Sequence, residues 1–342
     1  MHRKGINFVI KPGVTNHILI SILHKKMSII NDINIAAKHI QEGNLVAFPT
    51  ETVYGLGANA LDPLAVAKIF EAKERPSFDP LIVHIGNLNQ LEQLVKENDE
   101  RIYKLAEKFW PGPLTIVLPK SDIIPDLVTS GLPTVGIRMP GNDIALDLIR
   151  TSNCPIAAPS ANKFGRISPT TALHVKKQLP GVDYILDGGK TTVGIESTII
   201  RLTDKGFQIL RNGIITKEDL ETIIPHDAKS KIESLSAPGM LKSHYSPRKK
   251  LLIADAKSSN TNLSKAGLIS FSGELEKAYA KVIRVSDKKD LKDYAVNMFE
   301  AMHTFEDDND IETIIAEPVE ETGIGIAIMD RLRKAEFNWR ED

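Results

Sequence analysis

The apolar residues of this chain form short strand-like runs separated by helical patterns, from Met27 to about residue 225. The stretch from Glu42 to Arg75 shows the arrangement in full. A short apolar run, residues 45–48, predicts a buried strand, and a polar turn and a glycine pair follow it. Because such runs alternate with helices along the chain, the pattern predicts a mixed sheet flanked by helices, an α/β fold.

The helix in this stretch is predicted to begin after Asp62, a good N-cap residue, with Pro63 in its first turn. Apolar residues at positions 65, 66, 69 and 70 recur at helical spacing and give it one buried face. Pro76 prevents the helix from continuing and holds Arg75 in an extended conformation. Lys73 and Arg75 therefore lie at the end of a rigid element, where a point charge and a guanidinium fork suit phosphate binding.

The other predicted elements follow from the same patterns. Strands are predicted at residues 80–85, 114–118, 134–138, 155–158, 184–186, 197–202 and 207–210, and helices near 33–40, 88–95, 102–109, 144–149, 171–179 and 216–224. Beyond a polar stretch, strands are predicted at 250–254, 267–271 and 311–316, with helices at 295–305 and through Leu332.

These patterns divide the chain into four parts. Residues 1–26 are predicted to be an N-terminal extension with Met27 as the alternative start, since they are too poor in Arg and Ser for a transit peptide. Residues 27–225 form the larger α/β domain, 226–248 an irregular linker, and 249–342 a small C-terminal α/β domain of Rossmann-like type. A length of 342 residues is sufficient for two domains.

The composition of the chain excludes several classes of protein and of site. Lys plus Arg (43) nearly balances Asp plus Glu (44), so no global field attracts polyanions. The single cysteine, Cys154, excludes an internal disulfide and a thiolate zinc cluster and fits a reducing compartment. Its apolar neighbours predict a buried, inert thiol. No run of 18 apolar residues occurs, so no membrane span is predicted.

Two glycine-rich strings resemble nucleotide-binding motifs only superficially. The string G-x-G-x-x-A at residues 55–60 does not sit directly at a strand-to-helix turn, and no acid ends the next strand. A structural turn, or close approach of the backbone to a ligand, is the favoured interpretation. The string 188–192 lacks the first glycine of a P-loop and no helix pattern follows it, so a loop is expected.

Other polar residues lie at the ends of predicted strands. Arg138 ends one strand, where a buried arginine would need an anionic partner. Ser160 and Asn162 follow another strand, and Arg211 follows a third. His84 is either a satisfied core histidine or a ligand contact. The sequence assembles neither a Ser/His/Asp triad nor a set of histidines with metal-ligand spacing.

Seven motifs occur in order: FPTETVYGLGANA, KERPSFDPLIVHI, WPGPLT, TVGIRMP, APSAN, GIESTII and ILRNG. Together they resemble the YrdC-like threonylcarbamoyl-AMP synthases. The later string SAPGMLKSHYSP and the small C-terminal domain are similar to the long, two-domain form of that family. The resemblance implies an open, twisted mixed sheet flanked by helices, with a large concave pocket.

The resemblance also implies a reaction and its partners. L-Threonine, bicarbonate and ATP would give L-threonylcarbamoyladenylate and pyrophosphate, with Mg²⁺ as cofactor. The product would be handed to the tRNA threonylcarbamoyltransferase machinery, which makes N6-threonylcarbamoyladenosine in tRNA. The enzyme would be a cytoplasmic nucleotidyltransferase.

The matching motif positions imply the site residues. Lys73 and Arg75 are the expected catalytic pair. Contacts with ATP are expected at Lys73, Arg75, Asp79, Thr134, Ser160, Asn162, Ser168, Arg211 and Tyr245, and contacts with L-threonine at Thr50, His84, Arg138, Ala158 and Ser197. Tyr245 would fold over ATP, so that the linker acts as a lid. Asp79, where many relatives carry Asn, is a candidate ligand of magnesium or its water shell.

This chemistry needs little covalent participation by the protein. A carbamate attacks the α-phosphorus in line, so positioning and charge neutralisation supply most of the rate. A non-catalytic module that binds double-stranded RNA or tRNA is the alternative, and the near-neutral charge argues against it. Carbamoyl transfer in hydrogenase maturation is disfavoured by the lack of zinc-finger cysteines.

Overall fold

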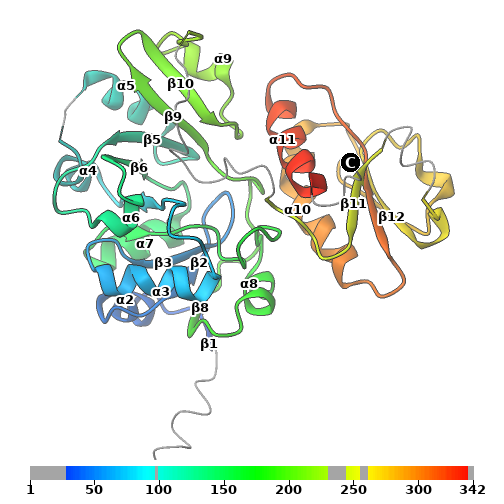
Figure 1. Ribbon diagram of the computed structural model, residues 1–342, viewed down its shortest axis with the longest axis horizontal. Coiled ribbons are helices and arrows are strands. Elements are labelled where there is room, and N and C mark those ends of the chain that lie inside the picture. Colours follow the sequence, from blue (N-terminus) through cyan, green and yellow to red (C-terminus); the bar gives the residue numbers. More distant parts are fainter. Residues whose placement is uncertain (1–27, 97–98, 230–243, 255–260, 338–342) are drawn as a thin grey trace, which may run out of the picture.

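Two α/β bodies make up the described part of the chain (Figure 1). The computed structural model describes residues 28–96, 99–229, 244–254 and 261–337. The predicted N-terminal extension, residues 1–26, and positions 230–243 of the predicted linker lie outside the described residues. The domain limits given above remain our proposal.

The first body is built on a ten-stranded sheet of order β1-β8-β2-β3-β7-β4-β6-β5-β9-β10. Parallel pairs such as β4 with β6 and antiparallel pairs such as β5 with β6 occur together, which confirms the predicted mixed sheet. The strands are β1 Ser28–Ile30, β2 Val46–Phe48, β3 Gly55–Asn59, β4 Ile82–His84, β5 Leu114–Pro119, β6 Thr134–Arg138, β7 Ile156–Ala157, β8 Tyr184–Leu186, β9 Thr198–Thr203 and β10 Gly206–Arg211. The helices are α2 Ile33–Gln41, α3 Pro63–Lys73, α4 Leu88–Leu94, α5 Glu100–Phe109, α6 Asp126–Thr129, α7 Asp143–Ser152, α8 Ala172–Gln178 and α9 Lys217–Glu221.

The second body has a four-stranded sheet of order β11-β14-β12-β13 whose pairs are all parallel. Its elements are β11 Lys250–Ile253, the 3-10 turn η2 Leu263–Lys265, β12 Ala266–Ser270, the 3-10 turn η3 Glu276–Ala278, β13 Lys281–Arg284, α10 Leu291–Asp307, β14 Thr313–Ala316 and α11 Ile324–Glu336. In Figure 1, α10 and α11 lie between this sheet and the first body.

Helix α3 forms for the reasons that the sequence predicts. The Asp62 carboxylate accepts a hydrogen bond from the Leu64 N–H at 2.9 Å, and Pro63 occupies the first turn. The helix ends where Glu74 adopts a left-handed conformation with φ of 54°, just before Arg75. Thr216 and Asp219 form a capping box at the start of α9, although this helix ends at Glu221, earlier than the predicted residue 224.

The structural turn that was one interpretation of Gly55 and Gly57 is absent, so that alternative was wrong, whereas a close approach of the backbone to a ligand stays a prediction. These residues belong to the buried strand β3, which pairs with β2. A Cβ on Gly57 would lie 2.8 Å from a ring carbon of Phe48 and 2.8 Å from Cγ2 of Ile156. The glycine is needed because side chains of neighbouring strands approach the backbone here, which no local pattern reveals.

Replacing Gly57 by valine should lower the free energy of unfolding by about 2 kcal/mol, because the new side chain overpacks the sheet. The midpoint of urea denaturation measures the change. Gly181→Ala is the matched control, since a Cβ at Gly181 meets no atom within 4 Å. Equal midpoints for the two variants would contradict the packing argument.

Candidate active site

A narrow cavity of about 50 Å³ lies where several loops of the first body meet residues 244 and 245. Eight residues that the sequence predicts for the site line it: Thr50, Arg75, His84, Arg138, Ala158, Ser160, Arg211 and Tyr245. The wall is completed by residues without a predicted role: Thr52, Val53, Gly55, Ile82, Pro159, Glu196 and His244. Segments that are far apart in the sequence are thus brought to one place.

Other predicted residues lie behind this wall. Lys73 donates from Nζ to the carbonyl oxygen of Ser160 at 2.6 Å, and also to that of Asn162. Ser168 donates to a carboxylate oxygen of Glu196 at 2.5 Å. Thr134 is different, because it begins β6 whereas Arg138 ends that strand, and it is absent from the cavity wall.

The end of α3 places two buried cations at one corner of the site. Burial lowers the pKa of Lys73 well below its usual value, and the charge of Arg75 adds to this effect while Asp79 opposes it. Arg75 donates to the backbone oxygens of Asp79 at 3.1 Å and Pro80 at 2.9 Å. Its Nη2 also lies 2.9 Å from Oδ2 of Asp79, so that carboxylate is an ion-pair partner of Arg75. The corner is cationic and rigid.

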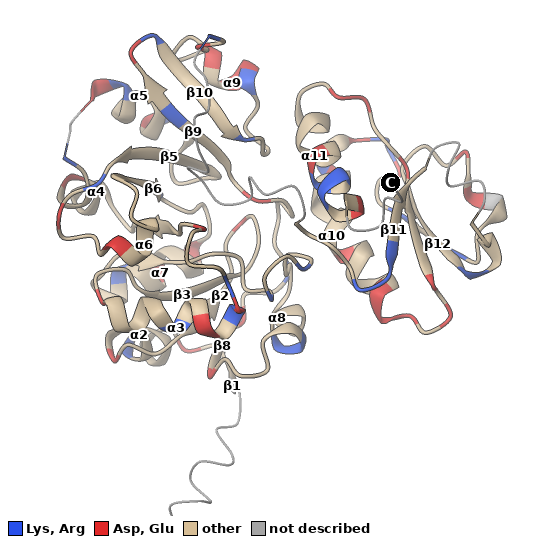
Figure 2. Cartoon of the chain, viewed as in Figure 1, with Lys and Arg blue, Asp and Glu red and all other residues tan. Residues whose placement is uncertain are grey.

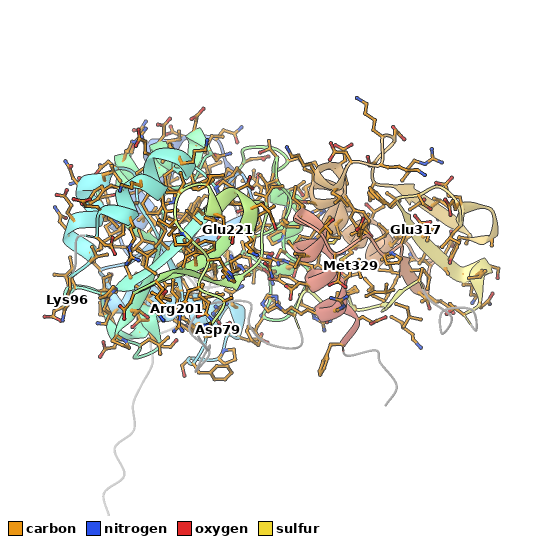
Figure 3. The ribbon with its side chains drawn as sticks, turned by 90° about the horizontal axis from the view of Figure 1, so that it is seen from above. Asp79, Lys96, Arg201, Glu221, Glu317 and Met329 are labelled. Carbon is orange, nitrogen blue, oxygen red and sulfur yellow. The ribbon has the colours of Figure 1, made fainter. Side chains whose placement is uncertain are left out.

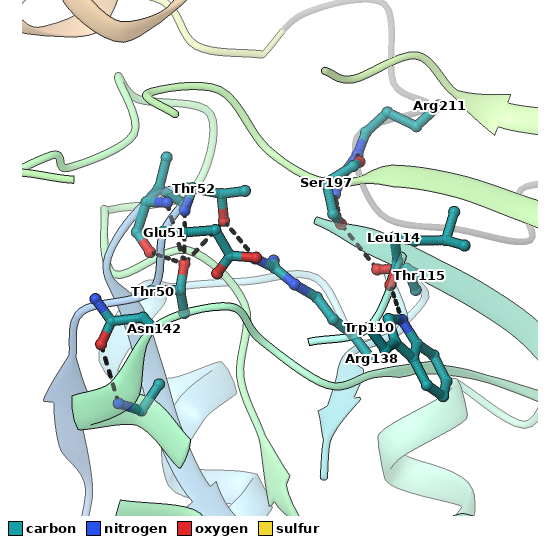
Figure 4. Close-up of polar contacts among 12 residues, drawn as sticks. Thr50, Glu51, Thr52, Trp110, Leu114, Thr115, Arg138, Asn142, Ser197 and Arg211 are labelled. Atoms are coloured by element: carbon teal, nitrogen blue, oxygen red, sulfur yellow. Dashed lines mark hydrogen bonds and ion pairs between the residues drawn. The ribbon is translucent and has the colours of Figure 1, made fainter. Parts of the chain in front are cut away.

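Arg138 crosses the floor of the cavity to the turn of residues 50–52 (Figure 4). Its Nη2 lies 2.7 Å from Oε1 of Glu51 and donates to Oγ1 of Thr52 at 3.0 Å. The anionic partner that a buried arginine requires is therefore Glu51. Among the described residues, Nε of Arg138 has no hydrogen-bond partner.

His84 lies beside Arg138, because the parallel register of β4 and β6 pairs the two residues. Burial, with a contribution from the charge of Arg138, lowers the pKa of His84 to about 3. The imidazole is therefore neutral at physiological pH. Its Nδ1 is buried and has no hydrogen-bond partner in the described part of the chain. His84 is thus a polar cavity residue and more than a core histidine.

The opposite wall contains Arg211, Glu196 and Tyr245. Arg211 donates from Nε to the backbone oxygen of Ser197 and from Nη2 to its hydroxyl, each at 3.0 Å (Figure 4). Tyr245 is almost completely buried and adopts a left-handed backbone conformation with φ of 63°. Its ring lies 5.5 Å from the guanidinium carbon of Arg331, a residue of the second body.

Sequence reasoning assigned no role to Glu51, Glu196, His244 or Arg331. Glu51 and Glu196 stand inside the quoted motifs, and their charge next to hydroxyl residues was an available signal. Arg331 stands in a helix whose pattern shows nothing unusual. Its position at the site depends on how the two bodies pack.

Positive charge predominates around the cavity. Five buried cations meet three buried carboxylates among the described residues: Lys73, Arg75, Arg138, Arg211 and Arg331 against Glu51, Asp79 and Glu196. Inside a protein such an excess attracts anions much more strongly than it would in water. Fold and site together define a class of two-domain α/β proteins that bind small anionic ligands in a buried, cation-rich cavity.

Comparisons with known proteins give the family. A family model for Sua5, YciO and YrdC proteins, described as telomere recombination, matches residues 38–213. A model described as threonylcarbamoyl-AMP synthase, C-terminal domain, matches residues 215–336. The threonylcarbamoyl-AMP synthase of Pyrococcus abyssi is 45% identical over 318 residues, which cover 89% of this chain and 93% of the relative. That of Bacillus subtilis is 42% identical over 325 residues, covering 88% and 91%.

Solved structures agree with these matches. P. abyssi Sua5 complexed with L-threonine has a TM-score of 0.81 and 43% identity, covering 91% of this chain and 98% of that one. A variant of the same protein, with a histidine and the adjacent tyrosine replaced by alanine, has a TM-score of 0.81 and 42% identity, covering 91% and 97%. The chain belongs to the Sua5/YrdC family of threonylcarbamoyl-AMP synthases, in its two-domain form.

Proposed function

We propose that this chain is an L-threonylcarbamoyladenylate synthase that converts L-threonine, bicarbonate and ATP into threonylcarbamoyl-AMP and pyrophosphate. The observation that supports this best is the meeting of Arg75, Arg138 and Arg211 at one cavity with Ser160 and the neutral His84. The substrates carry phosphate and carboxylate groups, which such cations bind. The product serves N6-threonylcarbamoyladenosine formation in tRNA, by hand-over to the tRNA threonylcarbamoyltransferase machinery.

The cavity has two ends in this proposal. The ATP end comprises Lys73, Arg75, Asp79, Thr134, Ser160, Asn162, Ser168, Arg211 and Tyr245. The threonine end comprises Thr50, His84, Arg138, Ala158 and Ser197. Arg138 holds the amino-acid carboxylate through the Nε donor that no described residue engages. The amine then projects away from this clamp toward the nucleotide end.

The reaction proceeds in two steps, at the place where the ATP end and the threonine end of the cavity meet. The threonine amine and bicarbonate condense to a carbamate with loss of water. A carbamate oxygen then attacks the α-phosphorus of ATP, and the bond to the β-phosphate oxygen breaks to release pyrophosphate. Lys73 and Arg75 act as the catalytic pair by neutralising the charge on the phosphates. Because no side chain forms a covalent intermediate, the residue types of the cavity suit this chemistry.

The magnesium ion is proposed to arrive with ATP. No group of three or more His, Cys, Asp or Glu residues that could hold a metal occurs in the described part of the chain. The residues do not fit a protein cage for the ion. Magnesium commonly keeps several waters and binds substrate phosphates with few protein ligands. Asp79, the candidate ligand of the ion or its water shell, already pairs with Arg75 through Oδ2.

Binding of ATP requires the cavity to open. A volume of about 50 Å³ is far below the 300–1,000 Å³ typical of ligand pockets. His244 and Tyr245 line the cavity. Their position in its wall and the small volume of the cavity support the proposal that the segment carrying them is a lid.

Replacing Tyr245 by alanine should uncouple the reaction. The lid would no longer exclude water from the adenylate, so pyrophosphate release should exceed threonylcarbamoyl-AMP formation several-fold. Both products can be measured in one reaction by mass spectrometry. Tyr279→Ala, a change in the second body away from the cavity, is the control. If coupling stays intact in the Tyr245 variant, the lid proposal fails.

The rival RNA-binding function gains no support from the charge distribution. Figure 2 shows basic and acidic residues interspersed over both bodies, whereas counterion-driven RNA binding favours a broad basic face.

No described helix has the length and apolar character that crossing a membrane requires. Cys154 is half-buried, and burial raises the pKa of its thiol to about 11, as expected of an inert cysteine. We keep the cytoplasm as the proposed location.

The decisive experiment supplies the purified chain with ATP, L-threonine and isotopically labelled bicarbonate. Mass spectrometry should detect threonylcarbamoyl-AMP that carries the label, and pyrophosphate release should depend on all three substrates. Release without threonine, or no release at all, would overturn the proposal. Micromolar RNA binding with steep salt dependence and without ATP turnover would favour the rival.

A further inference from the structure

Helix α11 of the second body reaches the wall of the cavity. Arg331, on this helix, is completely buried, and its Nε lies 3.2 Å from Oε2 of Glu196, a cavity residue. Its Nη1 also donates to the backbone oxygen of Asn212 at 2.6 Å. Figure 3 shows α11, marked by Met329, at the junction of the two bodies. One side chain of the C-terminal domain thus enters the first body.

The same helix holds the segment that covers the cavity. The His244 N–H donates to the backbone oxygen of Lys334 at 3.3 Å, and the Ser246 hydroxyl donates to that of Ala335 at 3.2 Å. Between them, the Tyr245 ring lies 5.5 Å from the Arg331 guanidinium carbon, within cation–π range. On the other side, the Ser246 N–H donates to the Gly165 oxygen of the first body at 2.8 Å.

Electrostatics makes Arg331 more than a packing contact. Burial acts to raise the pKa of Glu196, but the charges of Arg331 and Arg211 and the hydrogen bond from Ser168 act against it, and this pKa lies below its usual value. Glu196 therefore remains ionised and accepts the Ser168 hydroxyl at 2.5 Å. Arg331 thereby contacts both Tyr245 and Glu196, two residues of the same cavity wall.

We propose that Arg331 is a positioning residue, through which the C-terminal domain holds Tyr245 and Glu196 in place over the substrates. This inference rests on the proposed function and gives the second domain a task in it. When α11 is seated, the guanidinium group supports the tyrosine ring and the carboxylate together. When α11 withdraws, both lose that support and the cavity can admit ATP.

The test compares Arg331→Met with Arg333→Ala. Arg333 stands on the same helix, but it is exposed and pairs with Glu321. Arg331→Met should speed amide hydrogen exchange at residues 244–246, and should lower at least fivefold the threonylcarbamoyl-AMP formed per pyrophosphate released. Arg333→Ala should change neither quantity. Arg331→Lys, which keeps the charge but loses the fork, should recover part of the coupling.

A purely structural role predicts a different result. If Arg331 only pins the two bodies together, Arg331→Met lowers the melting temperature while the coupling ratio stays at the wild-type value, and the proposal is wrong. Should that variant fold poorly, Arg331→Met combined with Glu196→Gln removes both buried charges and should restore stability without restoring coupling. Restored coupling in the double variant would also overturn the proposal.

The two proposals fail in distinguishable ways. Hydrogen exchange at residues 244–246 needs no turnover, so it reports on Arg331 whatever the substrates are. Wild-type protein that makes no threonylcarbamoyl-AMP would contradict the proposed function, whereas unchanged exchange in Arg331→Met would contradict only the positioning role.

Discussion

Replacing Arg75 by alanine is expected to weaken ATP binding more than tenfold, a loss of about 1.4 kcal/mol or more. The guanidinium group is buried at the end of α3 and is held by the backbone oxygens of Asp79 and Pro80. Its loss removes the proposed phosphate-binding fork from the cavity wall. Titration calorimetry with ATP measures the affinity of each variant.

The same substitution should also destabilise the fold. It leaves the Asp79 carboxylate buried without its ion-pair partner, which costs about 3 kcal/mol in comparable cases. Combining Arg75→Ala with Asp79→Asn removes the stranded charge, so the free energy of unfolding should recover while ATP affinity stays low. This double variant separates binding from folding.

Arg150→Ala provides the matched control for Arg75. Arg150 is an exposed arginine on α7 that donates to the backbone oxygen of Gly86 and is not part of the cavity wall. Its replacement should leave ATP affinity within about twofold of wild type. Unchanged nucleotide affinity in Arg75→Ala would refute the phosphate-binding role of this residue.

Much of the fold follows from local patterns in the sequence. Asp62, Pro63 and Pro76 mark both ends of α3, and the Thr216 capping box marks the start of α9. These signals act over a few residues, so they can be read without a structure. Strand β3 was missed because its glycines are required by tertiary packing. The side chains of Phe48 and Ile156, on neighbouring strands, leave no room for a Cβ at Gly57. The three-residue strand β1 was missed as well.

The motifs predicted the arginines of the candidate site, but they did not predict which carboxylates pair with them. The motif positions named Arg75, Arg138 and Arg211, and all three line one cavity. The Glu51 carboxylate that pairs with Arg138 could not be assigned, because this ion pair depends on the tertiary arrangement. The pair of Glu196 and Arg331 joins residues 135 positions apart and belonging to different bodies.

Arg138→Ala is expected to have the largest effect on threonine use. The catalytic efficiency for L-threonine should fall about a hundredfold or more, a change of about 2.7 kcal/mol, because the proposed carboxylate clamp is lost. The Glu51 carboxylate would also stay buried without its partner, and its negative charge would then repel the substrate carboxylate. Steady-state kinetics at varied threonine concentrations measure the effect.

If Arg138 recognises the threonine carboxylate, its loss should impair threonine use and leave ATP binding almost unchanged. ATP affinity of Arg138→Ala should therefore remain within about threefold of wild type in calorimetry, unlike that of Arg75→Ala. Glu51→Gln in the Arg138→Ala background removes the repulsive charge and should recover part of the threonine efficiency, because it leaves a neutral side chain in place of a stranded anion. If Arg138→Ala weakens ATP and threonine binding equally, Arg138 supports the shape of the whole cavity and does not recognise the amino acid.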